Sequence, residues 1–459
     1  MAQDTAAYDH WHDRLAELAA AHRVPGAVLG FARGDEQQVA AYGVTNVDTG
    51  VEVTGDTLFQ IGSITKVFTA TVVMRLAEQG LLDLDKPVVG YLPELRLADG
   101  DLTAQVTMRH LLTHTSGIDG DVFTDTGRGD DALERYVAGL ADVPVNHPLG
   151  ATFSYCNAGY SLAGRVVEKV TGKVWDTALR ELLTGPLGAE QTVTLPDEAI
   201  LHRTAVGHVH EGDEPPRRTP VWGIARASGP AGTVNCAMAD LLAFARMHLA
   251  GGVAPDGSRL LSTDTATAMR TPQAQVPDRH AIADSWGLGW FRLGWGGTRV
   301  IGHDGNTVGQ SAFLRVLPEH DLAVGLLTNG GHTRDLYESL VREVVRELAG
   351  LEMTTPLAPP PQPPAVDITP YAGVYERTGV RMEVSTGDGR AARLRVIGSA
   401  PVEGVDRPPK EFDLVPVTDR VYAYRQPGYR TWTAATFYEL PDGSPYLHSG
   451  LRATPKVSG

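Results

Sequence analysis

Ser63 and Lys66 lie three positions apart in the segment SITK, at the start of a long apolar stretch. Residues i and i+3 share one face of a helix, so the lysine amine is expected beside the serine hydroxyl. A serine hydroxyl is a poor nucleophile at neutral pH and needs a base within hydrogen-bond reach. Burial lowers the pKa of a lysine, and the neutral amine can then accept that proton. An N-capping serine followed by a surface lysine has the same spacing, so this pair alone does not establish catalysis.

Tyr155 and Asn157 form a second candidate pair, in the segment YCN that precedes a helical pattern. A tyrosine hydroxyl near a cationic lysine ionises more easily and can relay protons between nucleophile and leaving group. The Asn157 amide can hold Lys66 and also bind a substrate carbonyl. Taken alone, a half-buried aromatic residue beside a helix cap explains this segment equally well. Cys156, between the two, is not expected to be a nucleophile.

His303, Gly305 and Asn306 lie in the segment GHDGN, after the apolar stretch TRVI. A glycine at 305 lets a substrate backbone approach a strand closely. The amide of Asn306, just beyond it, could face the amide of Ser63 as the second donor to the oxyanion of an acyl-transfer reaction. A histidine at a strand edge is more often structural than catalytic. The third segment therefore indicates a catalytic site only in combination with the first two segments.

These candidate residues need a helix and a sheet to bring them together. Residues 63–80 predict a helix with serine in its N-cap region, apolar residues on most faces and a terminal glycine, which indicates a buried central helix. Further helices are expected near residue 15 and at 106–117, 158–172, 238–252 and 336–350. Short strands of an antiparallel sheet are expected at 27–34, 39–46, 286–295, 298–305, 310–320 and 322–329.

The chain changes character at residues 354–366, TTPLAPPPQPPAV, because so many prolines favour an extended linker between domains. Residues 367–459 then alternate apolar and polar side chains over roughly six to eight short strands, which predicts a small barrel or sandwich. We therefore predict a catalytic domain at 1–353, a linker and a β-rich domain. Arg452, on the last predicted strand, could reach the cleft, but a solvated surface position is expected.

The order S-x-x-K, Y-x-N and H-x-G resembles the serine β-lactamase, penicillin-binding-protein and D-amino-acid peptidase superfamily. The segments FQIG at 59–62, VTMRHLLTHTSGI at 106–118 and PAG at 230–232 are also similar to this family, so the resemblance spans residues 10–350. It implies an α+β β-lactamase/transpeptidase-like fold, in which an antiparallel sheet packs beside a helical domain and the site lies in the cleft between them.

The resemblance also implies one role for each motif residue: Ser63 as the acylated nucleophile, Lys66 as its activating partner, Tyr155 as general acid and base, Asn157 as an orienting group, His303 in place of the lysine of the commoner K-T-G motif, and the amides of Ser63 and Asn306, beside Gly305, as the oxyanion hole. Without that lysine, the fixed positive charge for a β-lactam carboxylate is lost or becomes pH-dependent. The departure disfavours a β-lactamase and is consistent with esterases, amidases and peptide acyltransferases.

Composition excludes several classes of partner. A formal charge of −15 over 459 residues disfavours nucleic acid and anionic membrane surfaces. The sequence contains no run of about eighteen apolar residues that would predict a membrane-spanning helix. The amino terminus has no pattern typical of a secretory signal, and two cysteines cannot make a disulfide framework, so a cytoplasmic location is expected.

His110 and His114 have the i, i+4 spacing of zinc ligands, but no glutamate lies between them in an H-E-x-x-H arrangement. No third ligand is evident either. We therefore expect core or capping roles for both histidines, no metal ion and no bound cofactor.

The apparent lack of a leader, the missing K-T-G lysine and the β-rich domain together resemble the stand-alone penicillin-binding-protein-type thioesterases of actinobacterial nonribosomal peptide pathways, which carry a C-terminal lipocalin-like domain. This resemblance implies a peptidyl group, typically ending in a D-residue, that a peptidyl carrier protein delivers on phosphopantetheine. Transfer to Ser63 and attack by the peptide's own amino terminus would release a macrocycle. A D-stereospecific hydrolase (esterase, amidase or aminopeptidase) or a β-lactamase of the same fold are alternatives, and a catalytically inactive binding protein is a third.

Overall fold

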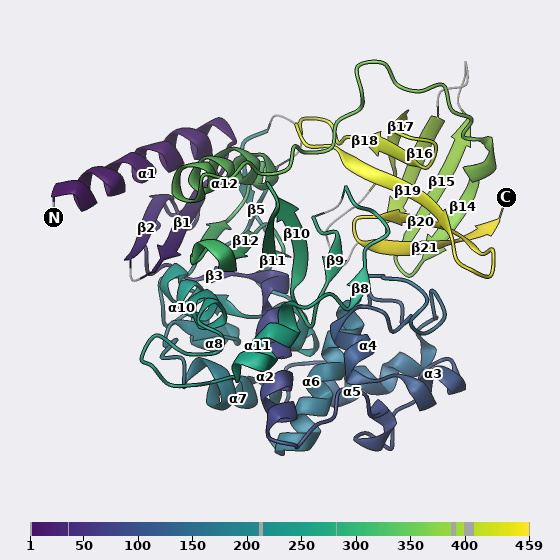
Figure 1. Ribbon diagram of the computed structural model, residues 1–459, viewed down its shortest axis with the longest axis horizontal. Helices are drawn as coiled ribbons and strands as arrows, with labels where there is room; N and C mark the ends of the chain where they lie inside the picture. Colours follow the sequence, from purple (N-terminus) through teal and green to yellow (C-terminus); the bar gives the residue numbers. More distant parts are fainter. Residues whose placement is uncertain are drawn as a thin grey trace.

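A central antiparallel sheet organises the computed structural model, which describes residues 2–34, 36–210, 214–280, 282–386, 392–398 and 408–458. The sheet has eight strands in the order β2-β1-β13-β12-β11-β10-β9-β8 (Figure 1). Their bounds are β1 Gly26–Arg33, β2 Glu36–Gly43, β8 Ala274–Gln275, β9 Ser285–Trp286, β10 Phe291–Trp295, β11 Thr298–Asn306, β12 Ser311–Leu317 and β13 Leu322–Thr328. The predicted strand 286–295 is therefore two strands.

Both faces of this sheet are covered, as strand β1 illustrates. Successive side chains of a strand point to opposite faces, and β1 is buried from Gly26 to Ala32. Val28 belongs to the core shared with the inner helices, whereas Leu29 and Phe31 belong to the core shared with the first and last helices of the α+β part. These two helices, α1 Ala2–Ala21 and α12 Thr333–Ala349, lie together over one face of the sheet (Figure 1).

Helix α2, Thr65–Glu78, lies on the opposite side of the sheet, and every residue from Thr65 to Met74 is buried. This confirms the predicted buried central helix. Ser63 lies in the N-cap region as predicted but does not cap the helix, because Gly62–Ile64 forms a separate 3₁₀ turn, η1, and the N-cap residue is Ile64, which has no side-chain hydrogen bond. Ser63 therefore keeps its hydroxyl free of a capping role.

The remaining helices complete the layer around α2. They are α3 Gly100–Gln105, α4 Met108–Leu112, α5 Ala132–Ala138, α6 Asn157–Thr171, α7 Trp175–Leu179, α8 Pro196–Ala199, α9 Gly229–Gly232, α10 Met238–Leu249 and α11 Thr263–Arg270. Short strands pair beside them: β3 Phe59–Gln60 and β4 Thr192–Val193 with β7 Asn235–Cys236, and β5 His208–Val209 with β6 Arg217–Arg218. The predicted helix 106–117 is shorter than expected, because His114 takes a positive φ of 59° and the chain turns there.

The last part of the chain is a closed antiparallel barrel, which decides between the predicted barrel and sandwich. Its strands are β14 Gly373–Arg377, β15 Val380–Thr386, β16 Ala392–Gly398, β17 Lys410–Pro416, β18 Val421–Tyr424, β19 Thr433–Glu439, β20 Pro445–Ser449 and β21 Arg452–Ser458. Strand β14 pairs with β21 and closes the ring around a core that includes Leu394, Phe437 and Leu447. Residues 387–391 and 399–407 of the predicted β-rich segment lie outside the described residues, and residues 354–366 contain no helix or strand.

The barrel lies against the α+β part, beside the sheet edge that carries β8 and β9, rather than standing apart (Figure 1). Leu451, in the turn between β20 and β21, is buried in a cluster with Phe153 and Trp286. The backbone amide of Tyr155 donates to the carbonyl of Leu451 at 2.8 Å. Within the described part of the chain, no helix is long and apolar enough to cross a membrane.

Candidate active site

Ser63 and Lys66 meet as their spacing predicts. Lys66 Nζ lies 3.0 Å from Ser63 Oγ and donates a second hydrogen bond of 2.7 Å to the carbonyl oxygen of Ala231, the third residue of α9. The Lys66 side chain is 0% exposed. Two fixed contacts and complete burial hold the amine against the hydroxyl that it would deprotonate.

Burial is also what sets the charge of Lys66. Loss of solvation lowers its pKa well below the usual value, and the nearby Arg452 guanidinium lowers it further. Among the described residues no carboxylate forms an ion pair with Lys66, and the raising effect of Asp121 is the smaller one. A neutral amine 3.0 Å from the hydroxyl can act as the general base for Ser63.

Tyr155 lies beside this pair, with the centroid of its ring 4.9 Å from Lys66 Nζ. Burial raises the pKa of Tyr155, although Ser63 and Arg452 both lower it. The prediction that a nearby lysine makes this tyrosine ionise more easily is therefore wrong, because burial of the tyrosine outweighs the charges around it. The Tyr155 hydroxyl makes no hydrogen bond of normal geometry within the described residues. It is placed to donate its proton rather than to stand as a phenolate.

Asn157 is the first residue of α6 and faces a different partner from the one expected. Its Nδ2 donates to Oδ1 of Asp121 at 2.9 Å, whereas Lys66 is held by Ser63 and Ala231. The predicted contact between Asn157 and Lys66 is therefore absent from the described structure. Asn157 still lines the same cavity as Ser63, so an amide remains available to a substrate carbonyl.

Cys156, between these two residues, has a structural role. Its sulfur accepts from the amide of Gly159 at 3.1 Å and caps α6. Burial raises the pKa of the thiol to about 12. The thiol therefore stays protonated at neutral pH, in accord with the expectation that it is not a nucleophile.

His303 faces the same cleft from strand β11, with its ring centroid 6.1 Å from that of Tyr155. Burial lowers the pKa of His303 to about 3. Its Nδ1 lies 2.6 Å from the carbonyl oxygen of Asp304, and because that oxygen only accepts, Nδ1 carries the proton. The imidazole is therefore neutral near neutral pH, in accord with the expectation that the fixed positive charge of the K-T-G lysine is lost at this position.

Gly305 and Asn306 border a narrow contact between β11 and the turn that holds the nucleophile. A Cβ on Gly305 would lie 1.8 Å from the carbonyl oxygen of Ile61 and 2.9 Å from the amide nitrogen of Ser63. A Cβ on Gly62, whose φ is +51°, would lie 2.6 Å from the amide nitrogen of Asn306. Only glycines allow this approach, and it places both predicted oxyanion amides at one contact.

A cavity of about 1870 Å³ opens in front of these groups. Its lining includes the motif residues Ser63, Tyr155, Asn157, His303 and Asn306, the segment 221–226, and the barrel segments 378–380, 431–434 and 450–452. Small-molecule sites typically enclose about 300–1,000 Å³, so this cavity has room for a larger ligand. The barrel is part of its wall.

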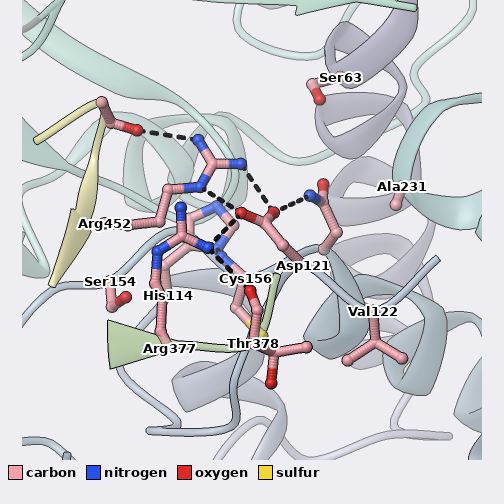
Figure 2. A network of polar contacts seen from close by, with 12 residues as sticks. Ser63, His114, Asp121, Val122, Ser154, Cys156, Ala231, Arg377, Thr378 and Arg452 are labelled. Atoms are coloured by element: carbon pink, nitrogen blue, oxygen red, sulfur yellow. Dashed lines mark hydrogen bonds and ion pairs between the residues drawn. The ribbon is translucent and has the colours of Figure 1, made fainter. Parts of the chain in front are cut away.

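Arg452 was expected at the solvated surface, and this expectation is wrong. Its guanidinium enters the cleft, donates from Nε and Nη2 to the carboxylate of Asp121, and lies 4.9 Å from the centroid of the Tyr155 ring. Arg377, at the end of β14, donates to the same carboxylate at 2.7 Å (Figure 2). Asp121 and Arg452 are 331 positions apart, so no sequence spacing could have paired them.

The two histidines of the zinc-like pair have separate structural contacts. His114 Nδ1 accepts from the amide of Cys156 at 3.0 Å, and its ring stacks on Tyr155 with centroids 4.3 Å apart. His110 instead contacts Thr107 at the start of α4. A search of the described ranges finds no group of three or more His, Cys, Asp or Glu side chains that could hold a metal ion.

Comparison with known proteins places this geometry in a family. Over 373 residues the sequence is 46% identical to Penicillin-binding protein 4 of Amycolatopsis lactamdurans, which covers 81% of this chain and 98% of the relative. The structure is similar to that of SurE, with a TM-score of 0.79 and 30% identity over 99% of this chain and 100% of SurE. A structure of SurE with D-Leu gives a TM-score of 0.76 at 29% identity, again over 99% and 100% of the two chains.

A third relative covers the α+β part. The D-stereospecific amidohydrolase from Streptomyces sp. is 26% identical, with a TM-score of 0.59 over 74% of this chain and 98% of that one. The family described as Beta-lactamase matches residues 11–381, which include every motif residue. The chain therefore belongs to the beta-lactamase family of serine enzymes and carries a closed β-barrel at its carboxyl end.

Proposed function

We propose that this protein transfers a peptidyl group from a carrier-protein thioester to Ser63 and releases it as a macrocycle. The acyl donor is a peptide ending in a D-residue on the phosphopantetheine arm of a peptidyl carrier protein. The acceptor is the amino terminus of the same peptide. No metal or bound cofactor takes part.

The cavity is the observation that carries this proposal. At about 1870 Å³ it exceeds the room needed for a single amino acid or a β-lactam, and a peptide must fold back on itself for its amino terminus to reach Ser63. Barrel segments around residues 379, 432 and 451 close one side of it. A peptide folded into this space would displace water from the front of Ser63, which favours attack by its own bound amine over attack by bulk water.

The first half-reaction follows from the contacts of Ser63. Lys66 Nζ takes the hydroxyl proton while Ser63 Oγ bonds to the thioester carbonyl carbon. The amides of Ser63 and Asn306 stabilise the oxyanion. The C–S bond then breaks, and the departing thiolate takes a proton that Lys66 or Tyr155 returns to it. The products are an acyl-Ser63 ester and the free phosphopantetheine thiol.

In the second half-reaction the proton transfers run in the opposite direction, and Ser63 Oγ regains its proton. The amino terminus of the bound peptide attacks the ester carbonyl and loses one proton to Lys66. The C–O bond to Ser63 breaks, and Oγ recovers the proton. A neutral His303 places no charge beside the acyl group, which suits an ester or amide chain without a carboxylate at that position.

Two similarities support the D-residue and the role of the barrel. The likeness to SurE extends over 99% of this chain and so includes the barrel, and a SurE structure contains D-Leu. The Streptomyces amidohydrolase is described as D-stereospecific. We infer the same preference at the acylating residue here.

A synthetic peptidyl thioester tests this function. Short peptides of at least eight residues carrying an N-acetylcysteamine thioester on a D- or L-terminal residue are incubated with wild type and with Ser63→Ala. Cyclic product from the D-terminal peptide, with none from Ser63→Ala, is expected. If the linear acid were the sole product, the proposal of macrocyclisation would be wrong.

D-stereospecific hydrolysis is the second candidate, favoured by the similarity to the Streptomyces amidohydrolase. It predicts release of the linear D-terminal acid and turnover of D-amino-acid amides and esters. The relative named Penicillin-binding protein 4 adds a direct check. Fluorescent penicillin that labels wild type rapidly and Ser63→Ala not at all would indicate β-lactam acylation, which a neutral His303 disfavours.

A further inference from the structure

Asp121 lies where the α+β part meets the barrel, and its carboxylate has four hydrogen-bond donors. Oδ1 accepts from Arg452 Nη2 at 2.9 Å and from Asn157 Nδ2 at 2.9 Å. Oδ2 accepts from Arg452 Nε at 3.1 Å and from Arg377 Nη1 at 2.7 Å. A carboxylate offers about four acceptor sites, so all are used and the orientation of each donor is fixed. Figure 2 shows the donors converging on this side chain.

Two of those donors belong to the cavity in front of Ser63. Asn157 and Arg452 both line it, and the Arg452 guanidinium lies 4.9 Å from the centroid of the Tyr155 ring. The bidentate pair with Asp121 leaves only Nη1 of Arg452, which donates to the carbonyl of Gly450 at 2.8 Å. These hydrogen bonds therefore hold the guanidinium in place, with its Cζ over the ring of Tyr155.

The backbone of the same tyrosine is also held by the barrel. The Tyr155 amide donates to the Leu451 carbonyl at 2.8 Å, and the amide of Ala453 donates to Ser154 Oγ at 3.2 Å. Leu451 and Ala453, which make these two contacts, directly precede and follow Arg452. The barrel edge thus fixes Tyr155 through its main chain, while Asp121 fixes the cation above its ring.

We propose that Asp121 is a positioning residue that joins the barrel to the proton-transfer machinery by holding Arg452 and Asn157 in register with Tyr155 and Ser63. The inference rests on one part of the proposed function, that Ser63 is the acylated nucleophile, and on no particular substrate. It makes barrel docking a requirement for fast acylation, because the guanidinium comes from β21 and the carboxylate from the α+β part.

The neighbouring Asp119 provides a contrast within the same loop. Its Oδ2 accepts from the amide of Thr378 in the turn between β14 and β15, so it also contacts the barrel. It makes no hydrogen bond to Asn157 or Arg452 within the described residues. The two arginines hold the pKa of Asp121 below its usual range despite burial, so this carboxylate stays ionised at working pH, whereas burial raises the pKa of Asp119. A purely structural role for the loop predicts similar effects of substitution at both positions.

The test measures acylation of Ser63 itself, independently of the peptide substrate. The burst of p-nitrophenol from a p-nitrophenyl ester reports the acylation rate constant in wild type, Asp121→Asn and the matched control Asp119→Asn. A loss of positioning by about 1 Å costs on the order of 100-fold, so the Asp121→Asn rate constant should fall by about that factor while the ester affinity changes little. Asp119→Asn should keep a rate constant close to that of wild type. Equal rate constants in the two variants would overturn the proposal.

Two further variants separate positioning from charge and from folding. Arg452→Lys keeps the positive charge but loses the bidentate pair, so its acylation should also slow; a wild-type rate would mean that charge alone suffices and would refute positioning. The double variant Asp121→Asn/Arg452→Lys should be no slower than the slower single variant, because both changes break one interaction. If the fold reductions in acylation rate of the two single variants multiplied in the double variant, Asp121 and Arg452 would not act through one shared interaction. Near-ultraviolet circular dichroism identifies variants that fail to fold. A burst absent from wild type would instead count against the acyl-serine function.

Discussion

Two cations flank one tyrosine ring, the buried Lys66 and the half-buried Arg452, and their surroundings differ. Lys66 Nζ and Arg452 Cζ each lie 4.9 Å from the centroid of the Tyr155 ring. Lys66 has hydroxyl and carbonyl partners only, and burial lowers its pKa strongly. Arg452 forms a bidentate pair with Asp121, and its pKa is raised.

The difference shows how one cleft can hold a base and a fixed charge side by side. A buried charge without a counter-ion gives up its proton, whereas a paired charge keeps it. The uncharged Lys66 amine is the form that can accept the Ser63 proton. The charged guanidinium can neither lose a proton nor move while Asp121 holds it.

The largest expected effect comes from Lys66→Arg, which places a permanent charge where the protein keeps a neutral amine. A guanidinium cannot accept the Ser63 proton, so acylation should fall by about 100- to 10,000-fold, the usual contribution of a general base. The p-nitrophenol burst measures it. Lys66→Met serves as the uncharged control for folding. Near-normal acylation by Lys66→Arg would mean that another group is the base.

The second-largest effect is expected when Arg452 loses its carboxylate partner, Asp121. Asp121→Ala leaves two arginines without their shared partner and should lower the free energy of unfolding by roughly 2–4 kcal/mol, somewhat less than for a fully buried pair. Urea unfolding followed by tryptophan fluorescence measures it. The control is Asp85→Ala, which breaks an exposed bidentate pair with Arg109 and should cost at most about 1 kcal/mol. Equal costs would contradict the distinction between buried and exposed pairs.

A smaller effect concerns the pH dependence of stability. The folded state keeps Lys66 unprotonated above its lowered pKa, whereas the unfolded chain binds that proton up to about pH 10.4. Between those values the unfolded state binds more protons, so this group makes stability rise with pH, by up to about 1.4 kcal/mol per pH unit. The difference between wild type and Lys66→Met in urea unfolding at pH 6, 7 and 8 isolates it. A difference that does not change with pH would mean that Lys66 stays charged.

The smallest effect is expected at His303. Its pKa of about 3 keeps the imidazole neutral from pH 5 to 8, so no inflection of the acylation rate in that range should belong to it. His303→Ala should change substrate affinity by a few-fold through lost packing and leave the shape of the pH profile unaltered. An inflection near pH 6 to 7 that disappears in His303→Ala would show that the histidine titrates there.

Local patterns accounted for much of the fold and of the candidate site. The pairing of Ser63 with Lys66 depends on one helical turn, and the buried course of α2 follows from its apolar residues. The glycine at 305 indicated a close backbone approach, and a Cβ there would meet Ile61 at 1.8 Å. In each case the determining interactions span a few residues or one repeating pattern.

Charge states and distant partners were the parts that local patterns missed. Tyr155 was expected to ionise more easily beside Lys66, and for His303 the sequence left open whether the positive charge is lost or pH-dependent. Burial by surrounding elements decided both: it raises the pKa of Tyr155 and lowers the pKa of His303. Arg452 was assigned to the surface because the alternating polarity of its strand does not indicate that Asp121, far away in the sequence, is its partner.

The sequence by itself determined which groups could do acyl-serine chemistry, since Ser63, Lys66, Tyr155 and His303 fall in motifs set by short-range geometry. Only the tertiary structure decided which of them are charged and what orients them. It buries Lys66 with no counter-ion among the described residues and brings Arg452 from the barrel to Asp121 across 331 positions. Electrostatic energies depend on burial and on distances in space, and neither quantity is encoded at any single position of the chain.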